Sequence, residues 1–565
     1  MNNSPLVSVG TYLGLRLVQA GMKDFFTVPG DFTLVLLDQL LKVPDLRMIN
    51  CCNELNAGYA ADGYARETGF SMAVVTYTVG GLSMLNAVAG AYAENLSLLA
   101  VSGGPNTNDS PEHYKTHHTI GEYNIYHQEQ CYAPIVKAVC AIRHLEDAAR
   151  MIDDAIKVCL IEKKPVYLEI ACNLAGQLIP APTDSFLENF SFKAKSDERA
   201  LNAAVAAAAS RINAAVKPIL IAGVDIRTAD ASESFLQLAK KMESAVVTTP
   251  DAKGIVPEDL ATFIGTYWPD VSSPPSCSAI VESSDCQIMT GVQLTDYTTT
   301  GRTDLYKKES SIKIGKNSIS MPEGYFANVQ MSDFLAALAT KVAKNDDSMQ
   351  EFLRLKVDST VIPPAAPTDK LSLEELRRQI QAILTGDTTL LIETGDSWFN
   401  GQLMHLPKGA QYHVQMQYGS IGWSVGATFG AAIGSKPGRR VISLIGDGSF
   451  QLTAQELSSM IRYKVNPIIF LMNNGGYTIE VEIHDGPYNN IQNWDYAGLL
   501  NIFNAGKGNG LGIRANTAGE LSSAINQALA HEGGPVLIEC TLARDDCSTQ
   551  LLEWGSRVAK ANARI

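Results

Sequence analysis

The chain has 565 residues and a formal net charge of −14 at pH 7, with 46% hydrophobic and 18% charged residues. This length allows three or four domains, and the composition is that of an ordinary globular protein. The negative charge argues against nucleic acid or an anionic membrane as a partner, because both are themselves negatively charged. Ten scattered cysteines without a CxxC pair predict no zinc site and favour a reducing compartment, so we expect a cytoplasmic protein.

The first 185 residues alternate strand-like and helix-like patterns. The amino terminus predicts an amphipathic helix after Ser8 rather than a signal peptide. A further helix is predicted over 82–93, and short apolar runs predict strands over 25–28, 73–79, 98–102 and 165–170. This alternation predicts a doubly wound α/β domain over residues 1–185.

Two segments divide the rest of the chain, and the first of them, residues 171–195, is weakly periodic. Residues 171–195 and 344–370 predict linkers, and the second is expected to be semi-rigid because of its proline-rich run. Between them, residues 196–345 alternate helix and strand patterns but lack G-x-G-x-x-G. We therefore prefer a structural spacer to a domain that binds a cofactor or effector. A third α/β domain is predicted over 371–565.

The third domain contains the most informative pattern of the chain. Gly446-Asp447-Gly448 is followed by 24 residues and then by Asn473-Asn474. Apolar runs before both groups predict strands, and residues 453–463 between them predict a helix. Parallel strands joined in this way bring their carboxyl ends to one crevice. A carboxylate, an amide oxygen and a backbone carbonyl suit Mg²⁺ on a diphosphate, so the pattern is typical of thiamine-diphosphate enzymes.

Further candidates lie in the first domain. Glu54 follows Asn53 at the expected start of a helix, where stabilisation of the helix dipole is the alternative interpretation. His117-His118 and Asp31 follow strands of the same domain, so we expect them at one edge of its sheet, where functional residues collect. Their alternative interpretations are a solvated loop pair and a turn acid.

Six segments match, in order, those of the thiamine-diphosphate-dependent 2-keto-acid decarboxylases: 25–31, 51–66, 117–121, 393–400, 446–450 and 473–490. Over essentially its whole length the chain resembles this family. Within it, the chain is similar to the pyruvate decarboxylases, and residues 476–490 are most similar to the bacterial form. The resemblance implies three doubly wound parallel-sheet α/β domains, which are pyrimidine-binding, central and diphosphate-binding.

The resemblance also implies the cofactors thiamine diphosphate and Mg²⁺. The metal ligands would be Asp447, the side chain of Asn474 and the carbonyl of Gly476. Glu54 would hydrogen-bond the pyrimidine ring of the cofactor. The other residues expected to bind the cofactor are Thr394, Gly395, Asp396, Gly419, Ile421, Gly446, Gly448, Ser449 and Tyr477.

The same resemblance assigns catalysis and substrate binding. Glu54 would be catalytic, together with a proton-relay and substrate-positioning set that consists of Asp31, His117, His118 and Glu480. The walls of the substrate pocket would be Tyr297, Trp398, Ile479 and Ile483. Ordinary core packing is the alternative interpretation for the pocket residues.

The implied reaction is the non-oxidative decarboxylation of pyruvate to acetaldehyde and CO₂, as in ethanol fermentation. In this family Glu54 and the diphosphate site come from different subunits, which implies at least a dimer and suggests a homotetramer. A decarboxylase of indolepyruvate, phenylpyruvate or a branched-chain 2-keto acid is the alternative. The His117-His118 pair argues against an acetolactate-synthase type of enzyme, and Glu54 with Glu480 argues against a non-catalytic binding protein.

Two positions depart from the family pattern. Gly475 replaces a larger residue, and its backbone freedom is expected to loosen the metal loop. Ser420 replaces a bulkier or polar ring residue beside Gly419. Neither position carries a metal ligand or a catalytic acid.

Overall fold

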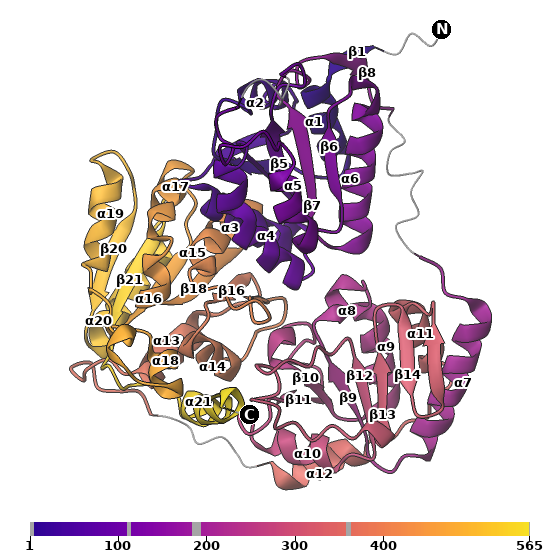
Figure 1. Cartoon of the computed structure of the whole chain (residues 1–565). Coiled ribbons are helices and arrows are strands. Elements are labelled where there is room, and N and C mark those ends of the chain that lie inside the picture. The colour runs from indigo at the N-terminus through magenta and orange to yellow at the C-terminus, as the bar shows by residue number, and fades with distance from the viewer. Residues whose placement is uncertain (1–4, 110–114, 184–193, 357–362, 564–565) are drawn as a thin grey trace.

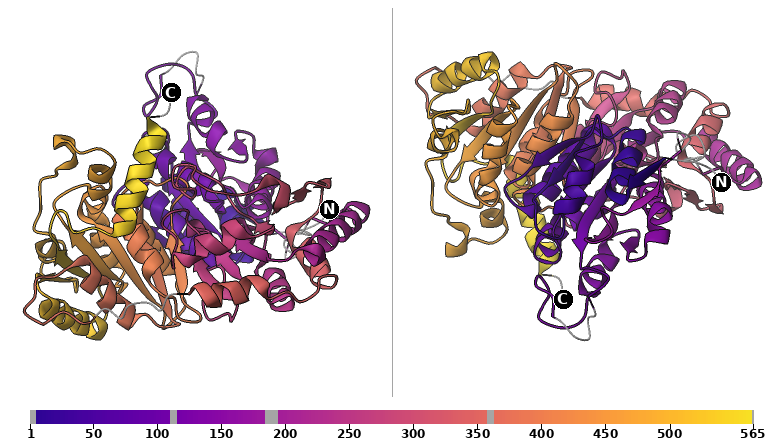
Figure 2. Two further views of the ribbon diagram at one scale, coloured as in Figure 1. Left: turned by 90° about the horizontal axis from the view of Figure 1, so that it is seen from below. Right: turned by 90° about the horizontal axis from the view of Figure 1, so that it is seen from above.

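The computed structural model describes residues 5–109, 115–183, 194–356 and 363–563, and these fold into three α/β domains (Figure 1). The first domain lies above the other two in Figure 1, and the central domain contacts the third, since Trp268 stacks on Phe399 at 4.7 Å. Figure 2 shows the same arrangement from below and from above. Within the described ranges, no helix is both long and apolar enough to span a membrane. The boundaries 1–185, 196–345 and 371–565 stay a proposal, which the placement of each large sheet inside one range supports.

The first sheet is parallel throughout, with the strand order β3-β2-β4-β5-β7-β6. Strands β4, β5 and β7 are buried along their whole length, as expected where helices cover both faces of a parallel sheet. Ser8 caps the predicted first helix by accepting a hydrogen bond from the N–H of Thr11 at 3.1 Å. The predicted strand over 73–79 ends earlier, at Val75.

The strands of this domain are β2 Asp24–Thr27, β3 Arg47–Asn50, β4 Ser71–Val75, β5 Leu98–Gly104, β6 Val139–Ile142 and β7 Val166–Ala171, with the antiparallel pair β1 Leu6–Ser8 and β8 Leu178–Pro180. Its helices are α1 Val9–Gln19, α2 Leu34–Leu40, α3 Glu54–Thr68, α4 Val79–Ala93, α5 His127–Tyr132 and α6 Ala148–Glu162, with short 3₁₀ turns η1 Ala133–Ile135 and η2 Leu145–Asp147.

The central sheet has the order β11-β10-β9-β12-β13-β14-β15. It is parallel as far as β13 and then adds β14 and β15 in antiparallel orientation. The strands are β9 Pro218–Ala222, β10 Val246–Thr248, β11 Phe263–Thr266, β12 Cys286–Thr290, β13 Ser311–Ile314, β14 Ser318–Met321 and β15 Gly324–Ala327. The helices are α7 Glu198–Ala214, α8 Asp225–Thr228, α9 Ser232–Met242, α10 Ser276–Ser283, α11 Met331–Ala339 and α12 Asp347–Leu355, with η3 Pro250–Ala252 and η4 Lys308–Ser310.

Helix α12 corrects the predicted linker over 344–370. Its Phe352 is only 6% exposed and packs into the same hydrophobic cluster as Ile219 and Cys277 of the central domain. Phe352 thus docks this helix on the central domain, and the apolar side chains of α12 lie on one face, as expected for a surface helix. Residues 357–362 of this linker, and 184–193 of the preceding one, lie outside the described residues.

The third sheet is also parallel throughout, with the order β17-β16-β18-β19-β21-β20. Its strands are β16 Thr388–Ile392, β17 Gln411–Val414, β18 Arg440–Gly446, β19 Ile468–Asn473, β20 Leu511–Ala515 and β21 Val536–Thr541. Its helices are α13 Leu373–Ile383, α14 Asp396–Leu403, α15 Trp423–Gly434, α16 Asp447–Gln451, α17 Leu457–Arg462, α18 Thr478–Ile483, α19 Tyr496–Asn504, α20 Ala518–Ala530 and α21 Thr549–Asn562, with η5 Ala454–Glu456 and η6 Pro487–Asn489.

The first and third domains pack through helices α3 and α15. A methyl group on Gly63 would lie 2.1 Å from the carbonyl oxygen of Ala427, and one on Gly430 would lie 1.7 Å from that of Ala60. Glycine is therefore required at both positions for the two helices to approach so closely. The ring of Phe26 in the first domain also lies 6.2 Å from that of Phe429, so one hydrophobic core continues across the domain boundary.

Candidate active site

A cavity of about 370 Å³ opens at the carboxyl ends of β16, β18 and β19. These strands are neighbours in one parallel sheet, and Gly446 pairs with Met472, so the GDG group and the Asn pair lie side by side. The predicted residues that line the cavity are Tyr297, Thr394, Gly395, Asp396, Trp398, Gly419, Ile421, Gly446, Gly448, Ser449, Asn474, Gly476, Tyr477, Ile479, Glu480 and Ile483. Most residues that the family resemblance implied for the cofactor and the substrate therefore line one cavity.

Asp447 lies at the end of β18 and is fully buried. Its carboxylate accepts hydrogen bonds from the N–H of Gly448 at 2.7 Å and from the N–H of Gly475 at 2.6 Å. Burial raises the pKa of Asp447 to about 6, against the opposing effect of these N–H groups. The Asn474 side-chain nitrogen donates to the hydroxyl of Thr478 at 2.5 Å, which leaves its oxygen to face a cation. A buried carboxylate beside an amide oxygen and a backbone carbonyl fits Mg²⁺.

Gly475 has a role in the same loop. Its φ is +82°, a left-handed conformation that glycine adopts without steric cost. This turn directs the N–H of Gly475 at Asp447. The backbone freedom that we expected to loosen the loop is thus used to hold the carboxylate. Gly448 is equally constrained, because a methyl group there would lie 2.4 Å from the ring of Tyr477.

Aromatic rings form one side of the cavity. Tyr297 lies 5.5 Å from Trp398 and 5.2 Å from Trp554, both in edge-to-face arrangement. The indole N–H of Trp268 donates to the carbonyl of Tyr297 at 2.7 Å and thereby fixes the segment that carries this ring. Trp398 and Trp554 are both fully buried. Trp554 lies on α21 near the end of the chain and was missed by the sequence analysis, since nothing in that helix marks its contact with the cavity.

Glu393 was also missed as an individual residue, although its segment was recognised. It is fully buried at the end of β16, and burial raises its pKa. Its carboxylate accepts hydrogen bonds from the N–H of Thr394 at 2.7 Å, the hydroxyl of Ser424 at 2.6 Å and the N–H of Gly422 at 3.1 Å. Glu393 therefore ties the strand end to the start of α15 and to the loop that carries Gly419 and Ile421.

Asp396 has a partner that the sequence did not indicate. Its carboxylate accepts hydrogen bonds from the hydroxyl of Ser548 at 2.5 Å and from the N–H of Ser548 at 3.1 Å. Burial raises the pKa of Asp396 to about 6. Ser548 caps α21, so Asp396 fixes the helix that brings Trp554 to the cavity. Asp396 therefore both lines the cavity and holds α21 in place.

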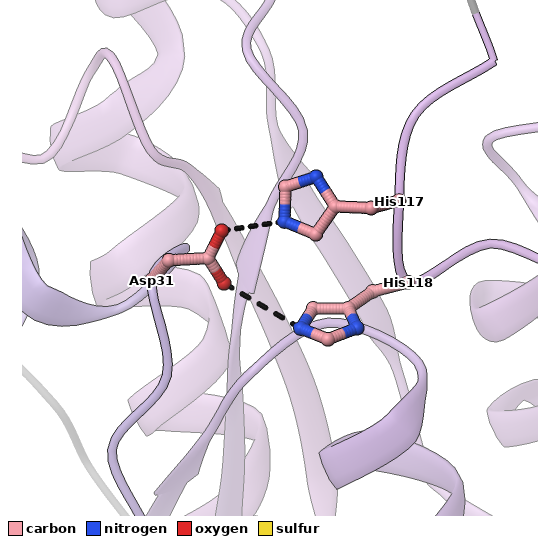
Figure 3. A group of neighbouring side chains, drawn as sticks. All are labelled: Asp31, His117 and His118. Carbon is pink, nitrogen blue, oxygen red and sulfur yellow. Dashed lines mark hydrogen bonds and ion pairs between the residues drawn. The ribbon is translucent and has the colours of Figure 1, made fainter.

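A second group of predicted residues lies at the carboxyl edge of the first sheet (Figure 3). Asp31 Oδ2 lies 2.5 Å from His117 Nε2, and Asp31 Oδ1 lies 3.5 Å from His118 Nε2. Phe32 stacks on the His117 ring at 4.8 Å. Desolvation raises the pKa of Asp31, but the hydrogen bond with His117 and the charges of both imidazoles outweigh it and hold the pKa below its usual value.

Glu54 is the first residue of α3, and Asn53 caps this helix by accepting from the N–H of Asn56 at 2.8 Å. Close to it, Thr78 adopts φ +49° and ψ −68°, and the N–H of Val79 donates to the carbonyl of Tyr77 at 2.7 Å. This is a γ-turn of the rare, strained kind, and it explains why the strand predicted over 73–79 stops early.

Two residues that the sequence analysis missed hold this turn. The Thr78 hydroxyl lies 2.8 Å from His127 Nε2, and the N–H of Thr78 donates to the side chain of Gln128. His127 Nδ1 lies 2.9 Å from the carbonyl of Asn124. Since that carbonyl can only accept, Nδ1 carries the proton and Nε2 accepts from Thr78. Helix α5 lies far from Thr78 in the sequence, so their contact forms only when the domain folds.

The two groups of predicted residues do not meet within one chain. In the part of the chain that the structure describes, no residue of the first domain lines the cavity of the third. Asp31, Glu54, His117 and His118 therefore lie outside the described cavity of the third domain, whereas Glu480 lines it.

Comparison with known proteins matches all three domains to one family. Residues 7–126 match the thiamine pyrophosphate enzyme N-terminal TPP binding domain, residues 205–341 its central domain, and residues 394–540 its C-terminal TPP binding domain. These matches confirm the predicted fold class and the three-domain architecture.

Curated relatives match over nearly the whole chain. Pyruvate decarboxylase 3 of Arabidopsis thaliana is 48% identical over 99% of this chain and 95% of its own length. Pyruvate decarboxylase of Neurospora crassa is 45% identical, over 99% of this chain and 97% of its own. Pyruvate decarboxylase 2 of Oryza sativa subsp. japonica is 47% identical, over 99% and 92%. These relatives come from plants and a fungus, so the expected closeness to the bacterial form is not supported.

Proposed function

The chain belongs to the pyruvate decarboxylase family of thiamine-pyrophosphate enzymes, and we propose that it converts pyruvate to acetaldehyde and CO₂ without oxidation, as in ethanol fermentation. The single observation that carries this proposal is the cavity, where a buried metal cradle and an aromatic wall lie next to each other. The cofactors are thiamine diphosphate and Mg²⁺, and the substrate is a small 2-keto acid.

The residues of the third domain fit this cofactor. Asp447, Asn474 and the carbonyl of Gly476 would hold Mg²⁺ on the diphosphate. The remaining cavity residues that we propose as its contacts are Thr394, Gly395, Asp396, Gly419, Ile421, Gly446, Gly448, Ser449 and Tyr477. When bound, thiamine diphosphate supplies the electron sink for the pair left by departing CO₂. Glu393 holds the loop that carries Gly419 and Ile421 by accepting hydrogen bonds from Gly422 and Ser424.

We propose that a second copy of the chain completes each site. Glu54 of one subunit would hydrogen-bond the pyrimidine held by the other, and Asp31, His117 and His118 would face the same cavity. The support is geometric, because these residues lie outside the cavity of their own chain as far as the structure describes it. A dimer is then the minimum assembly, and we expect a homotetramer.

The proposed catalytic groups hold and move protons. Asp31, His117, His118 and Glu480 would position the substrate and deliver the proton that replaces CO₂. Each group of this kind contributes about 10²–10⁴ to the rate. The hydrogen bond between Asp31 and His117 keeps the imidazole oriented toward that task. Ten free thiols suit a reducing compartment, so we also propose a cytoplasmic location.

The experiment that tests this function measures CO₂ release from pyruvate with and without thiamine diphosphate and Mg²⁺. We expect turnover only with both. A parallel assay compares kcat/KM for pyruvate and phenylpyruvate, because Tyr297, Trp398 and Trp554 narrow the cavity. A preference for phenylpyruvate would replace pyruvate by a larger 2-keto acid as the substrate, and acetolactate as the main product would reject the decarboxylase assignment.

A further inference from the structure

We propose that Asp31, His117 and His118 together form an inhibitory binding site for a divalent transition-metal ion such as Zn²⁺, separate from the Mg²⁺ site at Asp447. Each residue offers one ligand atom, and the three atoms lie within 4.8 Å of one another. Both imidazole Nε2 atoms face the same carboxylate, one toward each oxygen (Figure 3).

The ligand types select the metal. Two imidazoles and one carboxylate form a common set for Zn²⁺ and related ions, whereas Mg²⁺ prefers oxygen ligands. The Mg²⁺ cradle offers oxygen from Asp447 and Asn474 and contains no imidazole in the described loop. The two sites therefore differ in the ions that they favour.

The spacing is close to what such an ion needs. Ligand atoms at about 2.0–2.2 Å from a tetrahedral Zn²⁺ lie about 3.3–3.6 Å apart. His118 Nε2 and Asp31 Oδ1 already have this separation, at 3.5 Å. His117 Nε2 lies 2.5 Å from the other oxygen, Asp31 Oδ2, which is closer than two ligand atoms of one ion, so these side chains must adjust as the ion binds. The side chain of His117 is 60% exposed and that of Asp31 is 51% exposed, which leaves room for this adjustment.

Neighbouring groups restrict the orientations of the two imidazole rings. Phe32 stacks on the His117 ring at an interplanar angle of 13° and contacts His118 edge-on. His118 has a left-handed φ of +59°, which sets the direction of its side chain. The rings are thus arranged before any ion arrives, which lowers the entropic cost of binding. Three protein ligands leave one position of a tetrahedral ion open to solvent.

The consequence for activity rests on the proposed function. A bound ion occupies the nitrogen lone pairs and the carboxylate that proton transfer requires. Zn²⁺ is therefore expected to stop decarboxylation without releasing Mg²⁺ or thiamine diphosphate.

The test uses the holoenzyme saturated with Mg²⁺ and thiamine diphosphate. Zn²⁺ binding is measured by equilibrium dialysis, and CO₂ release from pyruvate is followed in parallel. We expect one tightly bound Zn²⁺ per chain, inhibition in proportion to occupancy, and recovery on adding a chelator that binds Zn²⁺ far more tightly than Mg²⁺. Relief of inhibition by additional Mg²⁺ would place the ion in the cofactor site and overturn the proposal.

The variants are read by metal binding and not by activity. His118→Ala and Asp31→Asn should each weaken Zn²⁺ binding by about tenfold or more. The control is His144→Ala, which removes an exposed imidazole outside the cluster and should bind Zn²⁺ like the parent. Unchanged binding in both cluster variants would reject the site. If pyruvate is not a substrate, the dialysis result still stands, so failure of the two proposals can be distinguished.

Discussion

Asp447 and Asp31 both follow a strand at the carboxyl edge of a parallel sheet, but their surroundings are opposite. Asp447 is fully buried, and burial raises its pKa to about 6. The Asp31 side chain is 51% exposed, and its imidazole partners hold its pKa below the usual value. Burial disfavours the charged form of Asp447, and a bound cation would offset this cost, whereas Asp31 already has compensating partners. This contrast supports the proposal that the third domain holds the cofactor in a buried site, while the exposed edge of the first sheet faces a second subunit.

The largest expected effect tests whether these halves meet between subunits. Glu54→Gln and Asp447→Ala should each lower kcat by about 10²–10⁴-fold. Mixed dimers of the two variants pair an intact Glu54 with an intact Asp447 at one of their two sites. Co-expression should then restore about a quarter of the parental activity if pairing is random.

Co-purified mixtures are assayed for CO₂ release from pyruvate, with each variant expressed alone as the control. A mixture no more active than the separate variants would mean that the site forms within one chain. In that case the edge of the first sheet that carries Asp31 would not need a second subunit.

The next prediction concerns the aromatic wall of the buried cavity in the third domain. Trp554→Ala should destabilise the protein by about 3–5 kcal/mol, because it removes a fully buried indole from an aromatic cluster. It should also raise kcat/KM for phenylpyruvate relative to pyruvate by enlarging the cavity. Urea unfolding and the two assays measure these changes. The matched control is Trp494→Ala, a side chain that is 38% exposed and should cost much less. An unchanged substrate ratio would contradict the assignment of Trp554 to the pocket wall.

A third prediction uses the pKa of Asp447 in the cofactor-free protein. The folded state holds this proton up to a pKa of about 6, above the ordinary value of 3.8. Between these values the folded state binds more protons than the unfolded state, so stability falls as the pH rises. The loss is on the order of 3 kcal/mol. Asp447→Asn should flatten this slope in denaturation experiments between pH 4 and 6, and Mg²⁺ with thiamine diphosphate should restore stability above pH 6. A parental slope in the variant would show that another group is responsible.

The smallest expected effect concerns the strained turn at Thr78 in the first domain. His127→Ala removes the acceptor for the Thr78 hydroxyl and should relax the strained turn beside Glu54. Loss of one buried hydrogen bond costs about 1–3 kcal/mol, and we expect kcat to fall by about tenfold. His127→Gln, which can still accept a hydrogen bond, should recover part of the rate. A variant that loses stability but keeps kcat would limit His127 to a structural role.

The sequence could predict residues whose position depends on local order along the chain. Gly446, Asp447 and Asn474 follow strands, and the crossover between parallel strands necessarily brings such ends together. The Ser8 and Asn53 caps are equally local, since each is followed by its helix. The roles of Asp31, Glu54, His117, His118 and Glu480 rest on family resemblance and remain proposals.

Two features of the central domain were not predicted from the sequence. The antiparallel strands β14 and β15 extend a sheet expected to be parallel, and α12 occupies a segment expected to be a linker. Strands β14 and β15 pair with the strands next to them along the chain, so short antiparallel connections extend the sheet, whereas α12 is held by the contact of Phe352 with Ile219 and Cys277 far away in the sequence.

By itself, the sequence predicted three α/β domains and placed the GDG group beside the Asn pair, because both depend on the order of strands along the chain. Most residues of the cavity wall were expected only from the resemblance to the family. Only the tertiary structure decided that Trp554 closes the cavity, that Glu393 ties β16 to α15, and that His127 and Gln128 hold Thr78 in a strained turn. These contacts join residues separated by many positions, and packing of whole elements brings them together. The same packing places Asp31 and Asp447 in opposite environments, although their positions along the strands are alike.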